Sequence, residues 1–161
     1  MSPAERRFYD GKRYDVARSV GHCLMHLMMA MRREVEVRMA DHGLTDAQWK
    51  PLWMLKSGRA SNAIELARET MIDAGAITRM LDRLEAKGLI ERVRSETDRR
   101  VVHLKLTDAG EAAVANVPHV LASVNNDFLR GFSEAEFRQL GNFIERMAAN
   151  GRALQDDKAA A

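Results

Sequence analysis

Residues 73–106, DAGAITRMLDRLEAKGLIERVRSETDRRVVHLKL, decide the fold of this chain. Asp73 has a side chain suited to cap the start of a helix, and Gly88 is of the type that commonly follows a helix end. Between them, apolar residues recur at helical spacing, at Ile77, Met80, Leu81 and Leu84. This spacing predicts a helix whose opposite, polar face is formed by Gly75, Thr78, Arg79, Asp82 and Arg83.

After Gly88 the pattern changes from a helical period to a strand period. Two short runs, LIERVR at 89–94 and VVHLKL at 101–106, are joined by a charged segment, and they predict a β-hairpin. Apolar residues alternate along the second run, at Val102, Leu104 and Leu106, so one face of the hairpin is expected to be buried. A short helix is predicted before residue 73. The order is therefore helix, turn, helix and a basic hairpin, or wing.

Four motifs in this region resemble one protein family. DRLEAKGLIER at 82–92 is followed by DRR at 98–100 and LTDAG at 106–110, and LTDAQWKPLWML at 44–55 precedes them. Together they resemble the multiple-antibiotic-resistance regulator (MarR) family, winged helix-turn-helix repressors that bind DNA as dimers. The resemblance implies a mainly α-helical fold with a small β wing, in which N- and C-terminal helices form a dimerisation layer.

The remaining sequence agrees with this organisation. A length of 161 residues is typical of one domain, and 46% hydrophobic residues suffice for a core. The net charge of +2 is mild, so the indication of DNA binding comes from where the arginines lie. The predicted parts are an N-terminal arm (1–14), dimerisation helices (15–43 and 107–152), a winged helix-turn-helix region (44–106) and a flexible tail (153–161).

Apolar helical stretches flank the DNA-binding region. A helix is expected over residues 15–40, and since nearly every side of it is apolar between residues 23 and 31, it should be covered all round. Thr107 is expected to cap a second long helix that is kinked at Pro118, and a capping box at 133–136 to open the last one. These apolar faces exceed what one winged helix can cover, which predicts a layer shared by two chains.

Two shorter helices carry similar capping signals. Thr45 and Gln48 form a capping-box pattern ahead of a helix that contains Pro51, where the missing N–H predicts a local kink. Residues 62–65 are expected to open the next helix in the same way. Its predicted inward-facing residues are Ile64, Leu66 and Ala67.

The polar face of the 73–87 helix suits the major groove of DNA. Small side chains allow its close approach, at Gly75, Ala76 and Thr78. Thr78 and Arg79 are predicted to contact bases, and Arg83 to contact a base or a phosphate. The wing carries four further arginines predicted to bind DNA, with Arg99 entering the minor groove: Arg92, Arg94, Arg99 and Arg100. A two-fold dimer would place two such helices roughly 34–36 Å apart on a pseudo-palindromic site.

Acidic residues interleave with these arginines, at Asp82, Glu85, Glu91, Glu96 and Asp98. The alternative interpretation is that some of the arginines form ion pairs within the chain, on a solvated surface, instead of contacting DNA.

The MarR resemblance also implies an effector, a small anionic aromatic molecule bound between the dimerisation helices and the winged helix. The predicted pocket combines soft apolar, aromatic and polar side chains: His22, Met25, His26, Met29, Arg38, Trp49, Trp53 and Asp73. A phenolic or nicotinic acid would suit it. The alternatives are that the methionines fill the core, that the tryptophans pack at a hinge, and that the histidines are satisfied on their own helix.

The same stretch permits two other hypotheses. His22 and His26 are four residues apart, a spacing that can chelate zinc, but no third and fourth ligand is nearby and no metal site is predicted. Some MarR-family relatives sense organic peroxides through a cysteine near the start of this helix, and Cys23 occupies a similar place. A reactive thiolate needs nearby cations or tyrosine hydroxyls, and the only tyrosines are Tyr9 and Tyr14, which favours an inert thiol. Redox sensing remains the alternative function.

The sequence does not indicate an enzyme. It has no nucleophile paired with a base, no phosphate-binding glycine loop and no metal triad, so neither catalytic residues nor a cofactor are predicted. The N-terminus lacks the apolar core of a signal peptide, and no stretch approaches the roughly 20 apolar residues of a membrane span. We expect a cytoplasmic protein whose partners are double-stranded DNA, a second copy of itself and a small aromatic acid.

Overall fold

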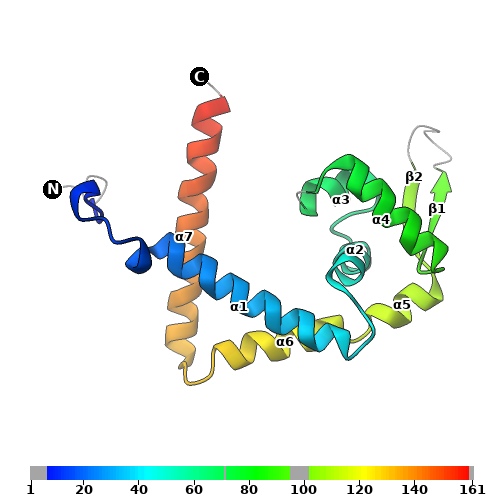
Figure 1. Ribbon diagram of the computed structural model, residues 1–161, viewed down its shortest axis with the longest axis horizontal. Coiled ribbons are helices and arrows are strands. Elements are labelled where there is room, and N and C mark those ends of the chain that lie inside the picture. Colours follow the sequence, from blue (N-terminus) through cyan, green and yellow to red (C-terminus); the bar gives the residue numbers. More distant parts are fainter. Residues whose placement is uncertain (1–6, 71, 95–101, 160–161) are drawn as a thin grey trace. The chain divides into compact units, whose positions relative to one another are not determined.

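The computed structural model describes residues 7–70, 72–94 and 102–159. The chain divides into two compact units, Met1–Val124 and Asn125–Ala161. Within the described residues, the regular structure consists of helices and one two-stranded antiparallel hairpin (Figure 1). The predicted fold class is confirmed.

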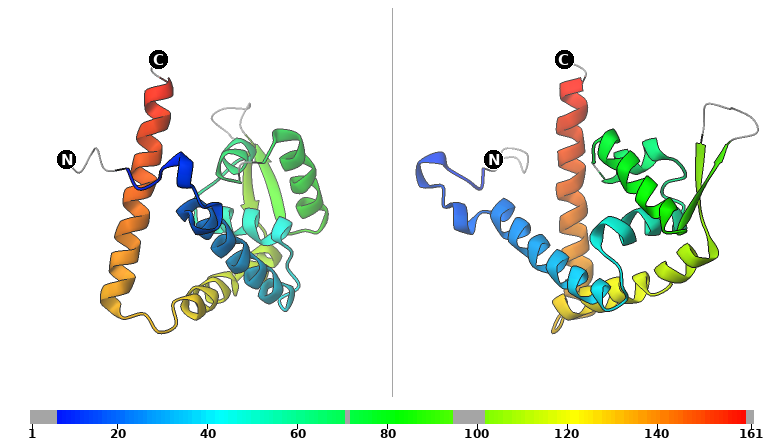
Figure 2. Two further views of the ribbon diagram at one scale, coloured as in Figure 1. Left: turned by 60° about the vertical axis from the view of Figure 1, so that its left-hand side comes forward. Right: turned by 45° about the vertical axis from the view of Figure 1, so that its right-hand side comes forward.

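The first unit contains the predicted helix-turn-helix and wing. Its elements are α2 (Asp46–Lys56), α3 (Ala63–Thr70), α4 (Ala74–Ala86), β1 (Ile90–Arg94), β2 (Val102–Leu106) and α5 (Asp108–Val114). The two strands lie beside α4 in all views (Figure 1, Figure 2). In the antiparallel pair, Ile90 is opposite Leu106 and Arg92 is opposite Leu104. A single apolar core joins these elements, with its most buried side chains at Leu52, Leu66, Ile77, Leu81, Leu84 and Val114.

α4 begins and ends where the sequence predicts. Asp73 caps it by accepting a hydrogen bond from the Ala76 amide at 2.9 Å. Gly88 follows the helix with a φ of 68°, a left-handed conformation that glycine adopts without steric cost. The predicted apolar face is buried at Ile77, Leu81 and Leu84 and half-buried at Met80.

α2 begins at its predicted capping box, in which the Gln48 side chain accepts a hydrogen bond from the Thr45 amide at 3.0 Å. The helix runs without a break through Pro51, which is buried in the core. Pro51 therefore does not end α2, and the local kink predicted there stays a prediction.

α1 (Val20–Ala40) starts later than the predicted start at Asp15. Two short 3-10 turns precede it, Gly11–Arg13 and Val16–Arg18. Ser19 caps the helix by accepting a hydrogen bond from the His22 amide at 3.3 Å. The Tyr9 hydroxyl accepts another from the first helical amide at 2.9 Å. Side chains of Tyr9 and Ser19 thus accept hydrogen bonds from backbone amides in the first turn of α1, and the chain before Ser19 does not extend the helix.

The helix predicted after Thr107 is two helices. α5 ends at Val114, and α6 (Val117–Phe128) begins after a two-residue break. Pro118 is the second residue of α6, where its missing N–H would have no intrahelical partner in any case. The sequence predicts that Pro118 kinks one long helix. In the structure Pro118 lies in the first turn of a separate helix, α6.

The predicted orientation of Ile64 is wrong. Its side chain is 82% exposed, whereas Leu66 is fully buried and Ala67 is half-buried. Successive helical residues are rotated by 100°, so Ile64 and Leu66 lie about 200° apart on α3 and cannot share its single inward face.

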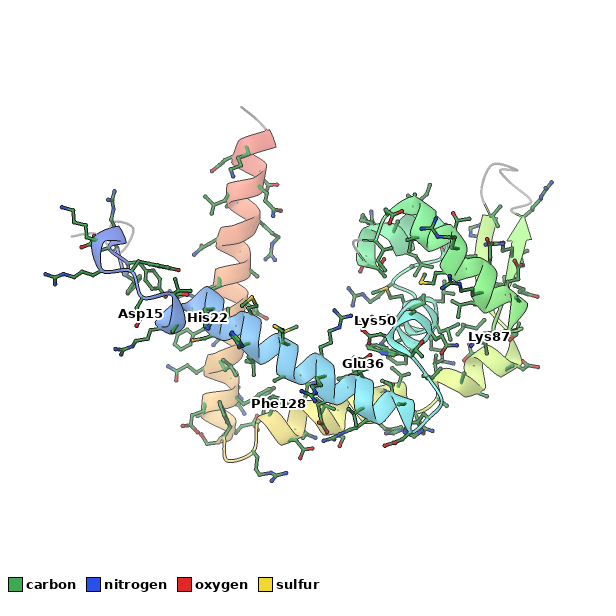
Figure 3. All side chains as sticks on the ribbon, viewed as in Figure 1. Asp15, His22, Glu36, Lys50, Lys87 and Phe128 are labelled. Carbon is green, nitrogen blue, oxygen red and sulfur yellow. The ribbon has the colours of Figure 1, made fainter. Side chains whose placement is uncertain are left out.

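The expected covering of α1 is not supplied by the described part of this chain. Between residues 23 and 31 most side chains are exposed, including Leu27, Met28 and Met29. The buried residues of α1 are Val35 and Met39, towards its C-terminal end. Figure 3 shows His22 near the opposite, N-terminal end of the same helix.

The second unit is dominated by α7 (Glu134–Ala159). The predicted capping box is present, because the Glu136 carboxylate accepts hydrogen bonds from the Ser133 amide at 2.8 Å and from its hydroxyl at 2.7 Å. α7 continues into the stretch 153–161 that was predicted as a flexible tail. Its described side chains are all exposed. Among the described residues, no helix combines the length and apolar character that a membrane crossing requires.

Candidate nucleic-acid interface

The exposed face of α4 presents the residues predicted to read DNA. Thr78, Arg79 and Arg83 are all exposed, and neither arginine has an ion pair among the described residues. The Thr78 hydroxyl donates to the Ala74 carbonyl at 3.0 Å, which leaves its oxygen lone pairs free to accept a further hydrogen bond. The structure therefore places two guanidinium groups, one helical turn apart and without an ion pair in the described part of the chain, on the solvent side of this helix.

Gly75 leaves room at the first turn of α4. A Cβ atom at this position would lie 3.3 Å from the Asp73 carboxylate and 3.7 Å from Nη1 of Arg79. The distance to Arg79 is an ordinary van der Waals contact, so only the Asp73 side chain would have to move slightly for a larger residue. Ala76, next to it, is half-buried.

Of the four predicted wing arginines, the structure describes two, and these have different environments. Arg92 forms ion pairs with two carboxylates of α4, Asp82 and Glu85, as the alternative interpretation of the sequence allows. Arg94 is exposed and has no ion pair within the described residues. Arg99 and Arg100 lie outside the residues that the structure describes, so the minor-groove contact of Arg99 stays a prediction.

The base of the wing is fixed by the motif LTDAG. The Thr107 hydroxyl donates to the Gly88 carbonyl at 2.5 Å and accepts from the Gly110 amide at 3.1 Å, so it links the end of α4 to the start of α5. Gly110 is buried against the backbone of Leu89. This contact requires glycine, because a Cβ atom at Gly110 would lie only 2.0 Å from the Leu89 carbonyl oxygen. The orientation of the wing is therefore set by backbone contacts.

A cavity of about 540 Å³ opens between the start of α2 and α4. Its lining combines cationic groups of α4 with an apolar floor: Thr45, Ala47, Gln48, Ile72, Ala76, Arg79, Met80, Arg83, Leu84 and Lys87. Figure 3 labels Lys87, the C-cap of α4. Arg79, Arg83 and Lys87 follow one another at four-residue steps, so they share one side of the helix. This spacing is visible in the sequence, but only the structure shows that α2 supplies the facing wall.

The predicted effector residues do not gather into one cavity in the described chain. The rings of His22 and His26 contact each other at a tilt of 53°, with centroids 4.3 Å apart, on the stretch of α1 that also exposes Met25 and Met29. Trp49 is buried in the core, with its indole N–H donating to Asp46 at 3.0 Å.

The remaining effector candidates have structural partners. Trp53 is half-buried and packs on the same core as Trp49. Arg38 pairs with Glu34 at 2.8 Å and donates to the Ser123 hydroxyl at 2.7 Å, and Asp73 caps α4. Among the described residues, no group of three or more metal-ligating side chains is present.

Asp46 connects α1 with α2. Its carboxylate pairs with Arg32 of α1 at 2.9 Å and with Lys50 of α2 at 2.6 Å, and it also accepts from the Trp49 indole. Burial alone would raise the pKa of Asp46. The hydrogen bond and charge of Lys50, the hydrogen bond from Trp49 and the charge of Arg32 outweigh burial and hold the pKa of Asp46 below its ordinary value. No motif in the sequence marks Asp46 as a link between two helices.

Cys23 is exposed on the first turn of α1, with its sulfur 3.8 Å from the Ala17 carbonyl oxygen. Tyr9 is brought to the start of the same helix through its hydrogen bond to Val20, although it is distant from Cys23 in sequence. A tyrosine hydroxyl therefore lies near the N-terminus of α1, which the sequence analysis did not anticipate.

Comparison with known proteins decides the family. The sequence model of the MarR family matches residues 44–102. The solved structure of the transcriptional regulator PA3341 is 32% identical, with a TM-score of 0.74, and the match covers 84% of this chain and 99% of that one. The chain belongs to the MarR family. As a MarR-family protein with a winged helix, it is a DNA-binding transcriptional regulator.

Two further MarR-like structures are informative. A cysteine-to-serine mutant of MarR from E. coli, solved with operator DNA, is 26% identical with a TM-score of 0.69, and the match covers 80% of this chain and 92% of that one. BpsR from Bordetella bronchiseptica is 24% identical, with a TM-score of 0.71 and coverage of 84% and 96% respectively, and so has a similar fold. Its structure concerns the regulation of BpsR DNA binding by 6-hydroxynicotinic acid.

Proposed function

We propose that this MarR-family protein is a homodimeric repressor that is released from a pseudo-palindromic operator by a small aromatic acid. The observation that carries the proposal is the cavity beside α4. Arg79 and Arg83, the exposed residues of α4 proposed to contact DNA, also line this cavity, which is large enough for a small ligand. In this proposal Thr78 and Arg79 contact bases, Arg83 contacts a base or a phosphate, and Arg94 contacts the backbone from the wing.

Dimerisation is supported by apolar side chains that this chain leaves exposed. On α7 they recur at steps of three, four and seven residues and form one stripe: Phe137, Leu140, Ile144, Met147 and Leu154. The methionine-rich stretch of α1 is exposed as well. Contiguous apolar surface of this kind is typical of an interface. A two-fold dimer would present two copies of α4 to neighbouring turns of the DNA.

The cavity lining suits an aromatic carboxylate. Arg79, Arg83 and Lys87 offer a carboxylate up to three cationic partners. Ile72 and Met80 supply apolar surface for a ring. The regulation of BpsR by 6-hydroxynicotinic acid supports this ligand class. Release would follow directly, because a guanidinium that pairs with the effector carboxylate is no longer available to a DNA phosphate.

Binding of the purified protein to its own promoter DNA, at fixed salt, tests the proposal. Benzoate, hydroxybenzoates and 6-hydroxynicotinate should release the DNA, whereas the uncharged analogues benzamide and nicotinamide should not. Ala47→Leu fills the cavity from α2, the wall opposite the arginines, and should abolish the response while DNA binding persists. If none of the acids releases the DNA, the proposed effector class is refuted, whereas the DNA-binding function is unaffected by this result.

Two variants distinguish the other hypotheses in the same assay. If the acid response is lost in His22→Ala/His26→Ala but retained in Ala47→Leu, the effector binds at the predicted α1 site instead. Hydrogen peroxide serves as the redox probe, since Cys23 is exposed. Release by peroxide alone, lost in Cys23→Ser, would make the protein a thiol sensor.

A further inference from the structure

Arg92 of β1 binds two carboxylates of α4 at the same time. Its Nη2 donates to Asp82 at 2.7 Å and its Nη1 donates to Glu85 at 2.7 Å. Asp82 and Glu85 are three residues apart and therefore neighbours on the helix surface. The planar guanidinium has donors on two separate terminal nitrogens, so it can bind one carboxylate with each. Each terminal nitrogen of Arg92 thus uses one of its two N–H groups for a carboxylate of α4.

The sheet register explains why Arg92 points towards α4. Alternate residues of a strand share one face, so Arg92 lies on the same face as the buried Ile90 and directly opposite the buried Leu104. Arg94 lies on that face too, one step further along the strand, where no ion pair forms among the described residues. Two arginines of one strand face thus differ in their ion pairs among the described residues.

The position of Asp82 makes its neutralisation important for DNA binding. Asp82 lies on α4 between Arg79 and Arg83, and its side chain is 56% exposed. A carboxylate on the surface that approaches DNA would be repelled by the phosphates. Pairing with Arg92 reduces the combined charge of Asp82 and Glu85 from −2 to a net −1 for the three groups.

We propose that Arg92 is a positioning residue: it holds the wing against α4 and offsets part of the negative charge of Asp82 and Glu85, and it does not itself contact DNA. This inference rests on operator binding through α4. It replaces the sequence-based prediction that Arg92 is a DNA contact. Because all three side chains are partly exposed, the ion pairs contribute little to folding stability, and their loss should change DNA binding without unfolding the protein.

A double-mutant cycle tests this assignment. Operator affinity is measured between roughly 50 and 300 mM salt for the wild type, Arg92→Ala, Asp82→Asn/Glu85→Gln and the triple variant. Arg92→Ala should weaken binding roughly fivefold to tenfold while the slope of log affinity against log salt is unchanged, because no phosphate contact is lost. In the Asp82→Asn/Glu85→Gln background, the same change should have less than about a twofold effect, since the carboxylates through which Arg92 acts are gone.

Two results would overturn the proposal. If Arg92→Ala reduces the salt slope by about one in both backgrounds, Arg92 is a phosphate contact. If Arg92→Ala leaves affinity unchanged at every salt concentration, the ion pairs have no role in DNA binding. Arg94→Ala, on the same strand face, is the matched control and should reduce the slope by about one.

Thermal melts followed by circular dichroism verify that each variant is folded. If Arg92→Ala is unstable, Arg92→Gln replaces it, because glutamine keeps most of the side-chain length. Absence of operator binding by the wild type would count against the DNA-binding function itself. A changed slope in Arg92→Ala, with the wild type bound, would count only against the positioning role.

Discussion

Asp46 joins α1 to the DNA-binding region through one carboxylate, which pairs with Arg32 and Lys50. Asp46→Asn should destabilise the protein by roughly 1 kcal/mol near neutral pH, because two cations lose their partner. The pKa of Asp46 is lower in the folded than in the unfolded chain. The stabilisation is therefore fully present above the unfolded pKa, about 4, and is lost as the pH falls through the lower folded value. Thermal unfolding should show the difference between wild type and variant shrinking below about pH 4.

Asp157→Asn is the control for this prediction. Asp157 is an exposed carboxylate of α7 without an ion pair among the described residues, so its removal should leave the melting temperature nearly unchanged across the same pH range. A difference between wild type and Asp46→Asn that persists undiminished at pH 3 would show that the carboxylate charge is not the cause.

Residue roles were predictable where the partner lies nearby in sequence. Asp73 and Gly88 were correctly placed at the ends of α4, since a cap depends on the next three residues and a left-handed terminus on one residue alone. Arg92 could not be assigned in this way. Its two partners lie seven and ten residues away on another element, so the sequence left ion pairing and DNA contact as alternatives.

At the scale of elements, the packing of α5 on the base of the wing depends on the absence of a side chain at Gly110. Gly110→Ala would place a Cβ atom 2.0 Å from the Leu89 carbonyl oxygen and 3.3 Å from the Leu106 side chain. Because the nearest atom is backbone, α5 or the strand must shift. We expect destabilisation of about 3 kcal/mol and a melting temperature lower by roughly 6–12 °C, measured by circular dichroism.

Gly11→Ala is a matched control, since nothing lies within 4 Å of a Cβ atom at Gly11. It should change stability by less than about 0.5 kcal/mol. Equal melting temperatures for the two variants would mean that α5 does not depend on this close contact.

The helices and strands were largely predictable from the sequence, and the errors in predicting them have physical causes. The wing strands and α4 follow clear periodicities and appear where expected. Ile64 was misplaced although helical geometry alone puts it about 200° from Leu66, whereas Pro118 was misplaced because a break in a helix depends on what packs against it. The cavity beside α4 was missed for the same reason, because its second wall comes from α2, about thirty residues earlier in the chain.

At the scale of the whole molecule, the apolar stripe of α7 should decide the oligomeric state. Ile144 lies on this stripe and is 50% exposed in the single chain. Ile144→Arg would place two charged side chains in a two-fold interface and remove the burial of two isoleucines. The dimer should dissociate roughly 100-fold more readily, as measured by sedimentation equilibrium. Operator affinity at fixed salt should fall with it, because a monomer contacts only one half-site.

Glu145→Arg introduces the same side chain one residue further along α7, rotated by 100° from the stripe. It should leave the dimer intact. A difference in dimer dissociation between the two variants would therefore be due to the position of the new arginine and not to its charge. If Ile144→Arg sediments like the wild type and still binds a two-fold operator, α7 does not form the interface. In that case the exposed methionine-rich stretch of α1 would have to hold the two chains together without it. Met28→Arg on α1 would then be the variant that yields monomers. Arg33→Glu, a substitution at a polar position of the same helix, would be its control.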